Sequence, residues 1–189
     1  SAGTNHGTQQ GGLTYAASRS GFGQAASFSG VNQYITIPHS AALNVGTTGL
    51  TVSLWVNTTN PKAASNGSRL LDKQTSGVAD GWTFDTYDIA RQSRNVVRLA
   101  STTAGLNSTR TFTSGTWQHL AFVYTGGTVT FYINGVASGT GSVGTLTNNT
   151  LPLQIGGPRG ALASGEYFQG LMDEVRIYSR ALTLSEIGN

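Results

Sequence analysis

Short segments in which apolar and polar residues alternate recur along almost the whole chain. Each is bounded by Gly, Pro, Asn or Ser residues. A period of two is typical of β-strands that bury one face. The clearest segments are 26–28, 34–37, 51–56, 69–73, 82–87, 96–100, 117–124, 128–133, 153–155 and 174–178. The pattern predicts an all-β sandwich of two antiparallel sheets, in which every strand has a core face and an outward face.

Turn and helix signals support this fold class. Asn134-Gly135 and the run 125–127 have the composition of hairpin turns, and they lie on either side of the segment 128–133. Only the run 183–187 looks helical, because Thr183 is followed three residues later by Glu186, as in a capping box. We therefore expect one short helical turn at the C-terminal end of a β-sandwich.

The composition indicates a secreted domain. The 189 residues suit one large β domain, and charged residues make up only 10% of the chain, against about 25% in typical soluble proteins. There is no cysteine, so disulfides and thiolate metal sites are excluded, and a hard cation is the metal that we consider. No segment resembles a signal peptide or a membrane span. We expect residues 1–189 to form a single extracellular domain cut from a longer multidomain protein.

The charge pattern argues against a nucleic-acid or membrane partner. The formal net charge is +3, and the arginines are spread singly, whereas nucleic-acid binders cluster them in stripes. The exception is a local group of Arg91, Arg94 and Arg98. We expect a monomer that binds neither nucleic acid nor membrane.

Alternation also predicts a polar outward face. It places Trp82 and Phe84 on the core side, and it leaves one outward set, which we expect to share a face: Asp85, Tyr87, Arg98, His119 and Tyr132. Arginine forks and carboxylates bind vicinal hydroxyls or sugar carboxylates, and a tyrosine ring offers an apolar platform to a sugar. We predict saccharide binding here, with Arg91 and Arg94 beside Arg98. We also expect Arg159, Glu166 and Tyr167 in a Gly-rich loop that forms the rim. The alternative is a solvated face with scattered ion pairs.

The run 170–182 places two adjacent acids, Asp173 and Glu174, inside an apolar strand pattern. Beside inward-facing side chains such as Val175, an acid must reach solvent or find a counter-charge, a hydrogen-bond network or a metal. We expect Glu174 to pair with an arginine. For Asp173 two interpretations stay open, namely a metal ligand or an acid that caps loop amides or pairs with Arg176 or Arg180.

Six motifs in order carry a resemblance to a known family. They lie at 26–38, 50–56, 117–124, 131–136, 153–157 and 170–182. Together they resemble the laminin-G-like, concanavalin A-like jelly-roll domains of bacterial secreted and surface proteins. The resemblance implies 12 to 14 strands in a convex and a concave sheet, with glycan binding on the concave face or its rim loops.

The same resemblance implies two further features. One is a structural calcium ion, and we expect Asp173, Asn5 and carbonyls near Gly30 as its ligands. However, this chain has Asn32-Gln33 where many relatives have a pair of acids, which should weaken calcium binding. The other is a core position for Trp55 and Trp117, and we also expect Trp82 in the core.

The sequence gives little support for catalysis. Glycosidases need two carboxylates held across one bond, and no such pair or nucleophile elbow is found. The sharpest enzymatic alternative is a polysaccharide lyase that uses Tyr87, Arg98 and His119. We predict a non-catalytic carbohydrate-binding module that holds a parent glycoside hydrolase or lyase near its polysaccharide. An adhesion or spacer module is the alternative from another class.

Overall fold

The computed structural model describes residues 5–60, 68–74, 80–88, 95–100, 105–158 and 166–187, and at 60, 87–88, 95–98 and 100 it describes the backbone only. Within these residues the chain forms two seven-stranded antiparallel sheets. Sheet A has the order β1 (Thr8–Gln10), β4 (Tyr34–Ile37), β13 (Leu153–Ile155), β6 (Ser68–Asp72), β7 (Thr83–Asp88), β8 (Asn95–Ala100) and β9 (Gly105–Asn107). Sheet B has the order β12 (Val136–Ser142), β11 (Thr128–Ile133), β10 (Gln118–Thr125), β5 (Leu50–Asn60), β14 (Gln169–Tyr178), β3 (Gln24–Ser29) and β2 (Thr14–Ala17). A 3-10 turn, η1 (Ala41–Leu43), and a short helix, α1 (Leu184–Ile187), complete the described elements.

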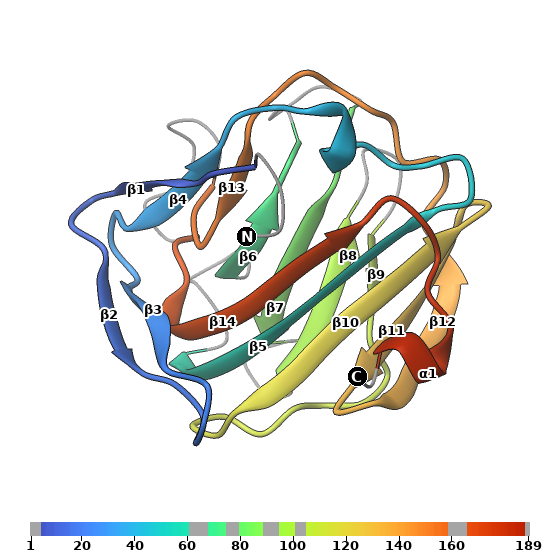
Figure 1. The fold of residues 1–189 in the computed structure, drawn as a ribbon. Helices are drawn as coiled ribbons and strands as arrows, with labels where there is room; N and C mark the ends of the chain where they lie inside the picture. The colour runs from blue at the N-terminus through green and yellow to red at the C-terminus, as the bar shows by residue number, and fades with distance from the viewer. Residues whose placement is uncertain are drawn as a thin grey trace.

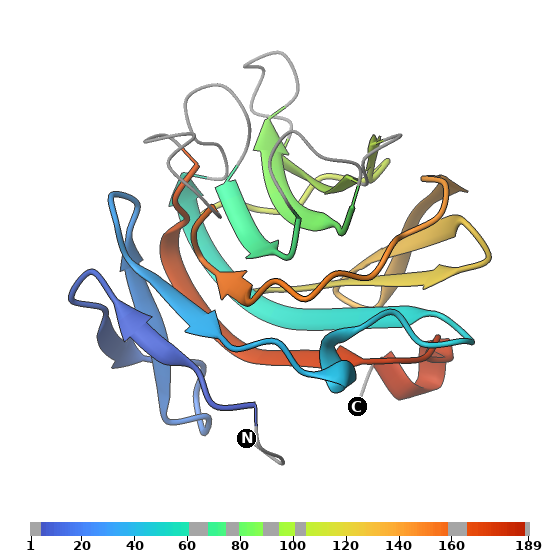
Figure 2. The same cartoon turned by 90° about the horizontal axis from the view of Figure 1, so that it is seen from above.

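The two sheets pack face to face as a jelly-roll sandwich. Strands β10, β5 and β14 run side by side through sheet B, and α1 is drawn beside β11 and β12 (Figure 1). Seen from above, β5 and β14 follow a long curve, and β6, β7 and β8 of sheet A lie on its inner side (Figure 2). The outer face of sheet A therefore lies on the concave side of the molecule, and the outer face of sheet B on the convex side.

Alternating side chains of both sheets fill the space between them. Leu54 of β5 and Phe122 of β10 are fully buried, and they belong to the same cluster as Phe84 of β7. Phe122 meets Trp82 and Phe84 edge to face, with ring centroids 5.8 and 4.9 Å apart. Trp82 is 1% exposed, which confirms its predicted core position. Because successive side chains point to opposite faces, this core determines which residues reach the outer surfaces.

The predicted segments agree with the observed strands. Each of the ten lies on a strand, with at most one residue beyond its end. Both predicted hairpin turns are present, with positive φ at Asn134 and Gly135 and at Gly126 and Gly127, as two-residue turns of this type require. The prediction missed β1, β2, β9 and β12, which are short or rich in small polar residues.

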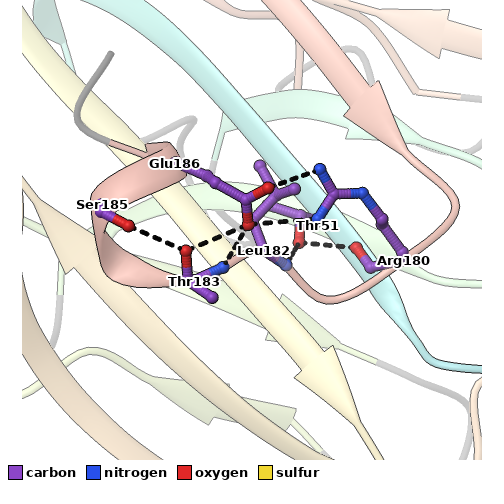
Figure 3. Close-up of polar contacts among 6 residues, drawn as sticks. All are labelled: Thr51, Arg180, Leu182, Thr183, Ser185 and Glu186. Carbon is purple, nitrogen blue, oxygen red and sulfur yellow. Dashed lines mark hydrogen bonds and ion pairs between the residues drawn. The ribbon is translucent and has the colours of Figure 1, made fainter.

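The C-terminal segment closes over the outer face of sheet B. The buried hydroxyl of Thr51 donates a hydrogen bond to the Arg180 carbonyl (2.8 Å) and accepts one from the Leu182 amide (2.9 Å), as Figure 3 shows. The Glu186 carboxylate accepts from the Thr183 amide at 2.9 Å and pairs with the Arg180 guanidinium at 2.7 Å. The predicted capping interaction is confirmed, and it holds α1 against the sheet.

Under this segment lies a second, smaller apolar cluster. Ala121, Val123, Leu182 and Ile187 form it, and Tyr132 packs against them. Tyr132 thus contributes to the packing beneath α1, on the convex side of the sandwich.

Candidate functional site

Four charged side chains gather on the outer face of sheet A, around Arg69 of β6. Its Nη1 lies 2.7 Å from Oδ2 of Asp85 on β7, its Nη2 lies 3.0 Å from Oε2 of Glu166, and its Nε lies 3.4 Å from Oδ2 of Asp72. We call these residues the Arg69 cluster. The side chain of Asp85 is fully buried, and that of Arg69 is 16% exposed. The register places Arg69 directly opposite Asp85 in the β6–β7 ladder, so the two share the outer face.

Burial shifts the ionisation of this cluster. It raises the pKa of Asp85 to about 6, although the Arg69 guanidinium and the Thr83 hydroxyl, which donates at 3.1 Å, oppose the shift. Burial also acts to lower the pKa of Arg69, but the surrounding carboxylates outweigh it and the pKa is raised. Buried charges on the solvent side of a sheet do not serve the core, and perturbed ionisable groups of this kind gather at functional sites.

The cluster has an excess of hydrogen-bond acceptors. Three carboxylates surround one guanidinium. In the part of the chain that the structure describes, Oδ1 of Asp85 and the buried Nε of Arg69 have no hydrogen-bond partner. An ionised carboxylate only accepts and a guanidinium only donates, so the arrangement suits a ligand with hydroxyls, which do both.

Several predicted saccharide-binding residues lie around this cluster. Arg98 on β8 stands directly opposite Asp85, and Tyr87 lies two residues beyond Asp85 on β7. Tyr167 follows Glu166 and packs against Tyr34, with ring centroids 6.2 Å apart. Arg91, Arg94 and Arg159 lie outside the described residues.

The expectation that all five outward residues share one face is wrong. His119 lies on β10 and Tyr132 on β11, both in sheet B, whereas Asp85 lies in sheet A. Alternation along a strand separates inside from outside, but it does not say which sheet the strand joins. The lyase set of Tyr87, Arg98 and His119 is therefore not assembled, because the core layer separates His119 from the other two.

The three predicted calcium ligands are not brought together. Asn5 Oδ1 accepts a hydrogen bond from Ser40 Oγ at 2.6 Å. Gly30 follows Ser29, which pairs with Gln169, so Gly30 lies about 15 Å along the strands from Asp173. Among the described residues no group of three His, Asp or Glu side chains is arranged to hold a metal. These residues do not fit a calcium site.

Asp173 instead has protein partners. The Ser18 hydroxyl donates to its Oδ2, Nη2 of Arg19 lies 4.0 Å from the same oxygen, and the Glu174 amide donates to its Oδ1 at 2.8 Å. The arginine partner of Asp173 is therefore Arg19, not the predicted Arg176 or Arg180. Glu174 pairs with Arg176, which confirms the predicted arginine partner.

A pocket of about 580 Å³ lies on the outer face of sheet B. Trp55, Trp117 and His119 line it. Both tryptophans are partly exposed, so the expected core positions are wrong for this pair. Strict alternation places both outside, since Leu54 next to Trp55 and Leu120, three residues after Trp117, face inward.

Arg69 is the functional candidate that the sequence analysis missed. It lies in an apolar strand segment, Ser-Arg-Leu-Leu-Asp, and alternation does not reveal which acids would surround it. That information lies in the strand order, which brings β6 beside β7 and next to the segment before β14.

The comparisons with known proteins agree with the architecture. Residues 28–188 match the sequence model of the Concanavalin A-like lectin/glucanases superfamily. Domain 4 of AbnA, a GH43 extracellular arabinanase from Geobacillus stearothermophilus, solved in complex with arabinotriose, is 25% identical with a TM-score of 0.69, over 94% of this chain and 80% of that one. A putative carbohydrate binding protein from Bacteroides ovatus is 18% identical with a TM-score of 0.66, over 92% and 52% of the two chains.

One curated relative comes from an animal. The adhesion G-protein coupled receptor V1 of Danio rerio is 28% identical over 150 residues, which are 72% of this chain and 2% of the receptor. The chain therefore corresponds to a small part of that relative's length. With its fourteen described strands in two sheets and the match over residues 28–188, the chain belongs to the concanavalin A-like lectin/glucanase superfamily, in its laminin-G-like form.

Proposed function

We propose that this domain is a non-catalytic carbohydrate-binding module, and that it binds a neutral polysaccharide at the Arg69 cluster on the outer face of sheet A. The observation that carries the proposal is the buried contact of Arg69 with Asp85 on the solvent side of the sheet. Charged groups held in this way are preorganised hydrogen-bond partners for a polar ligand.

The charge of the cluster supports an uncharged ligand. Its four described members comprise three acids and one arginine, so a uronate bound in direct contact with the cluster would meet a surplus of negative charge there. Sugar hydroxyls can donate to the carboxylates of Asp85 and Glu166 and accept from Arg69. Arg98, Tyr87 and Tyr167 extend the candidate binding face, together with Arg91, Arg94 and Arg159 as residues predicted from the sequence.

The comparisons support the same class of function. The GH43 domain shares the fold at 25% identity, and it was solved with arabinotriose. We propose by analogy that this chain is an extracellular module that holds a catalytic domain of its own parent protein near the polysaccharide, which raises the local concentration of enzyme without chemistry. No described helix has the length and apolar character to cross a membrane.

The alternative is an adhesion or spacer module. It is favoured by the match to a fragment of the Danio rerio adhesion receptor. An adhesion module would bind a protein, or nothing on its own, and no polysaccharide would retard the domain.

Affinity electrophoresis separates these functions. The domain is run through gels that contain neutral arabinans, xylans, fructans or galactans, or acidic pectin, with the Arg69→Met and Arg110→Met variants alongside, since Arg110 is an exposed arginine outside the cluster. We expect at least one neutral polysaccharide to retard the wild type and Arg110→Met equally, with no depolymerisation, and to retard Arg69→Met less. If no polysaccharide retards the wild type, the binding proposal fails. Unsaturated products absorbing in the ultraviolet would show a lyase.

A further inference from the structure

We propose that the domain carries a second saccharide site, on the opposite face of the sandwich from the Arg69 cluster. It is the pocket on the outer face of sheet B, and its ligand is an uncharged sugar residue stacked on Trp117. The site goes beyond the function proposed above, since it shares no residue with the Arg69 cluster.

Several parts of the chain line the pocket. They include Trp55 of β5, His119 of β10, Phe22 in the turn between β2 and β3, and Leu182 and Ile187 of the C-terminal segment. The C-terminal part is held in place through Thr51 and the Arg180–Glu186 pair (Figure 3). A concave site of about 580 Å³ lies within the size range of small-molecule sites.

The aromatic rings of the pocket differ in whether a ligand can stack on them. The Arg19 guanidinium lies between two rings, 3.8 Å from the centroid of Phe22 and 4.0 Å from that of Trp55. Trp55 also packs against His119, with ring centroids 5.3 Å apart. In the described part of the chain, Trp117 has no such ring or guanidinium contact. A sugar can therefore stack on the indole of Trp117. The rings of Trp55 and Phe22 are held in place by their contacts with the Arg19 guanidinium.

The charges in and around the pocket cancel in pairs. Arg19 lies 4.0 Å from Asp173, and Arg176 pairs with Glu174. Arg180 pairs with Glu186 at 2.7 Å. Each of these guanidinium groups has a carboxylate nearby, so the pairs carry no net charge, and the buried Nε and Nη2 of Arg19, which have no hydrogen-bond partner among the described residues, can donate to a hydroxyl. The electrostatics favour an uncharged ligand.

The polar groups of the pocket suit hydroxyls. Burial, together with the nearby charges of Arg19 and Arg176, lowers the pKa of His119, so at neutral pH its ring both donates and accepts. Asn134 is fixed beside it, because its Oδ1 accepts from the His119 amide at 2.8 Å and its Nδ2 donates to Gln118 at 2.9 Å. A sugar hydroxyl requires this mixture of donors and acceptors.

The strand geometry at the pocket is also unusual. The β14–β5 register shifts between Asp173 and Arg176, and Glu174 has a positive φ of 51°. A bulge re-aims side chains, and strained residues of this kind concentrate at functional sites. Here the bulge places the Glu174–Arg176 pair in the lining of the pocket.

Tryptophan emission tests the proposal. The full chain is titrated with oligosaccharides of arabinose, xylose, fructose, galactose or glucose, and with oligogalacturonate as a charged probe, while fluorescence and calorimetric stoichiometry are recorded. Trp82 is buried in the core, so a change reports on Trp55 and Trp117. We expect a neutral probe to change the emission of the wild type and of Arg69→Met alike, and oligogalacturonate to have no effect.

Two variants locate the binding. Trp117→Ala is expected to weaken this binding about tenfold by calorimetry. Phe22→Ala, which keeps all three tryptophans, should reduce the emission change. Tyr15→Ala, which removes another exposed aromatic ring from sheet B, is the control and should bind as the wild type.

Three results would overturn the second site: no neutral probe changes the emission, both pocket variants bind as the wild type, or Arg69→Met abolishes all binding. The last result would leave the Arg69 cluster as the site. Conversely, if Arg69→Met binds with unchanged stoichiometry while Trp117→Ala does not bind, the proposed site on sheet A fails and the second site stands.

Discussion

The Arg69 guanidinium and the Asp85 carboxylate meet at 2.7 Å on the outer face of sheet A, and the Asp85 side chain is fully buried there. Two neighbouring strands place them directly opposite each other. Because Asp72 and Glu166 approach the same guanidinium, the stability of this region and the proposed binding depend on one arginine.

Arg69→Met should destabilise the domain strongly. It leaves buried carboxylates without their counter-charge, and breaking a buried ion pair by removing one partner costs about 3–5 kcal/mol. Urea unfolding at pH 7 measures the loss. The matched control is Arg176→Met, which removes an exposed arginine from an ion pair and should change the free energy of unfolding by about 1 kcal/mol or less. Equal losses in the two variants would contradict the role given to the cluster.

Asp85 should make stability depend on pH in an unusual direction. Its pKa is raised from 3.8 to about 6 on folding, by burial above all. The folded state therefore binds more protons than the unfolded state between these values, and this group's contribution to stability falls as pH rises from about 4 to about 6. We expect Asp85→Asn to remove this component, so that the difference in free energy of unfolding between wild type and variant changes over that window. A constant difference from pH 4 to 7 would contradict the shift.

Thr51→Val should loosen the C-terminal segment. The variant removes the hydroxyl that bridges Arg180 and Leu182 (Figure 3), and the buried Leu182 amide loses its acceptor. An unsatisfied buried donor costs about 1–3 kcal/mol. Hydrogen exchange of the Leu182 amide and thermal unfolding measure the effect. Thr130→Val, which removes an exposed hydroxyl contact with Thr140, is the control and should have almost no effect. Unchanged protection of Leu182 would contradict the role of Thr51.

Calcium should not stabilise the domain through the predicted ligands. Asn5, Gly30 and Asp173 are separated, and Asp173 is occupied by Ser18 and Arg19. An ion that binds only the native state raises the melting temperature. We therefore expect the same melting temperature in calcium and in chelator. A higher melting temperature in calcium that Asp173→Asn abolishes would contradict this assignment.

The fold class and the outward position of single residues could be predicted from local pattern. Alternation is a property of a few consecutive residues, so it correctly placed Phe84 inside and Asp85 outside. Strict alternation also places the side chains of Trp55 and Trp117 on the outer face. The turn at Asn134-Gly135 and the cap at Thr183 were predictable for the same reason, because their chemistry is local.

Only the tertiary structure decided which outward residues meet. His119 and Asp85 both point away from the core, yet they lie on opposite sheets. The partners of Arg69 come from 16 residues away at Asp85 and from the segment before β14 at Glu166. The pairing of β5 with β14 likewise brings Asp173 opposite Trp55. Strand order depends on how the whole set of apolar faces is buried together, and no short stretch of sequence contains that information.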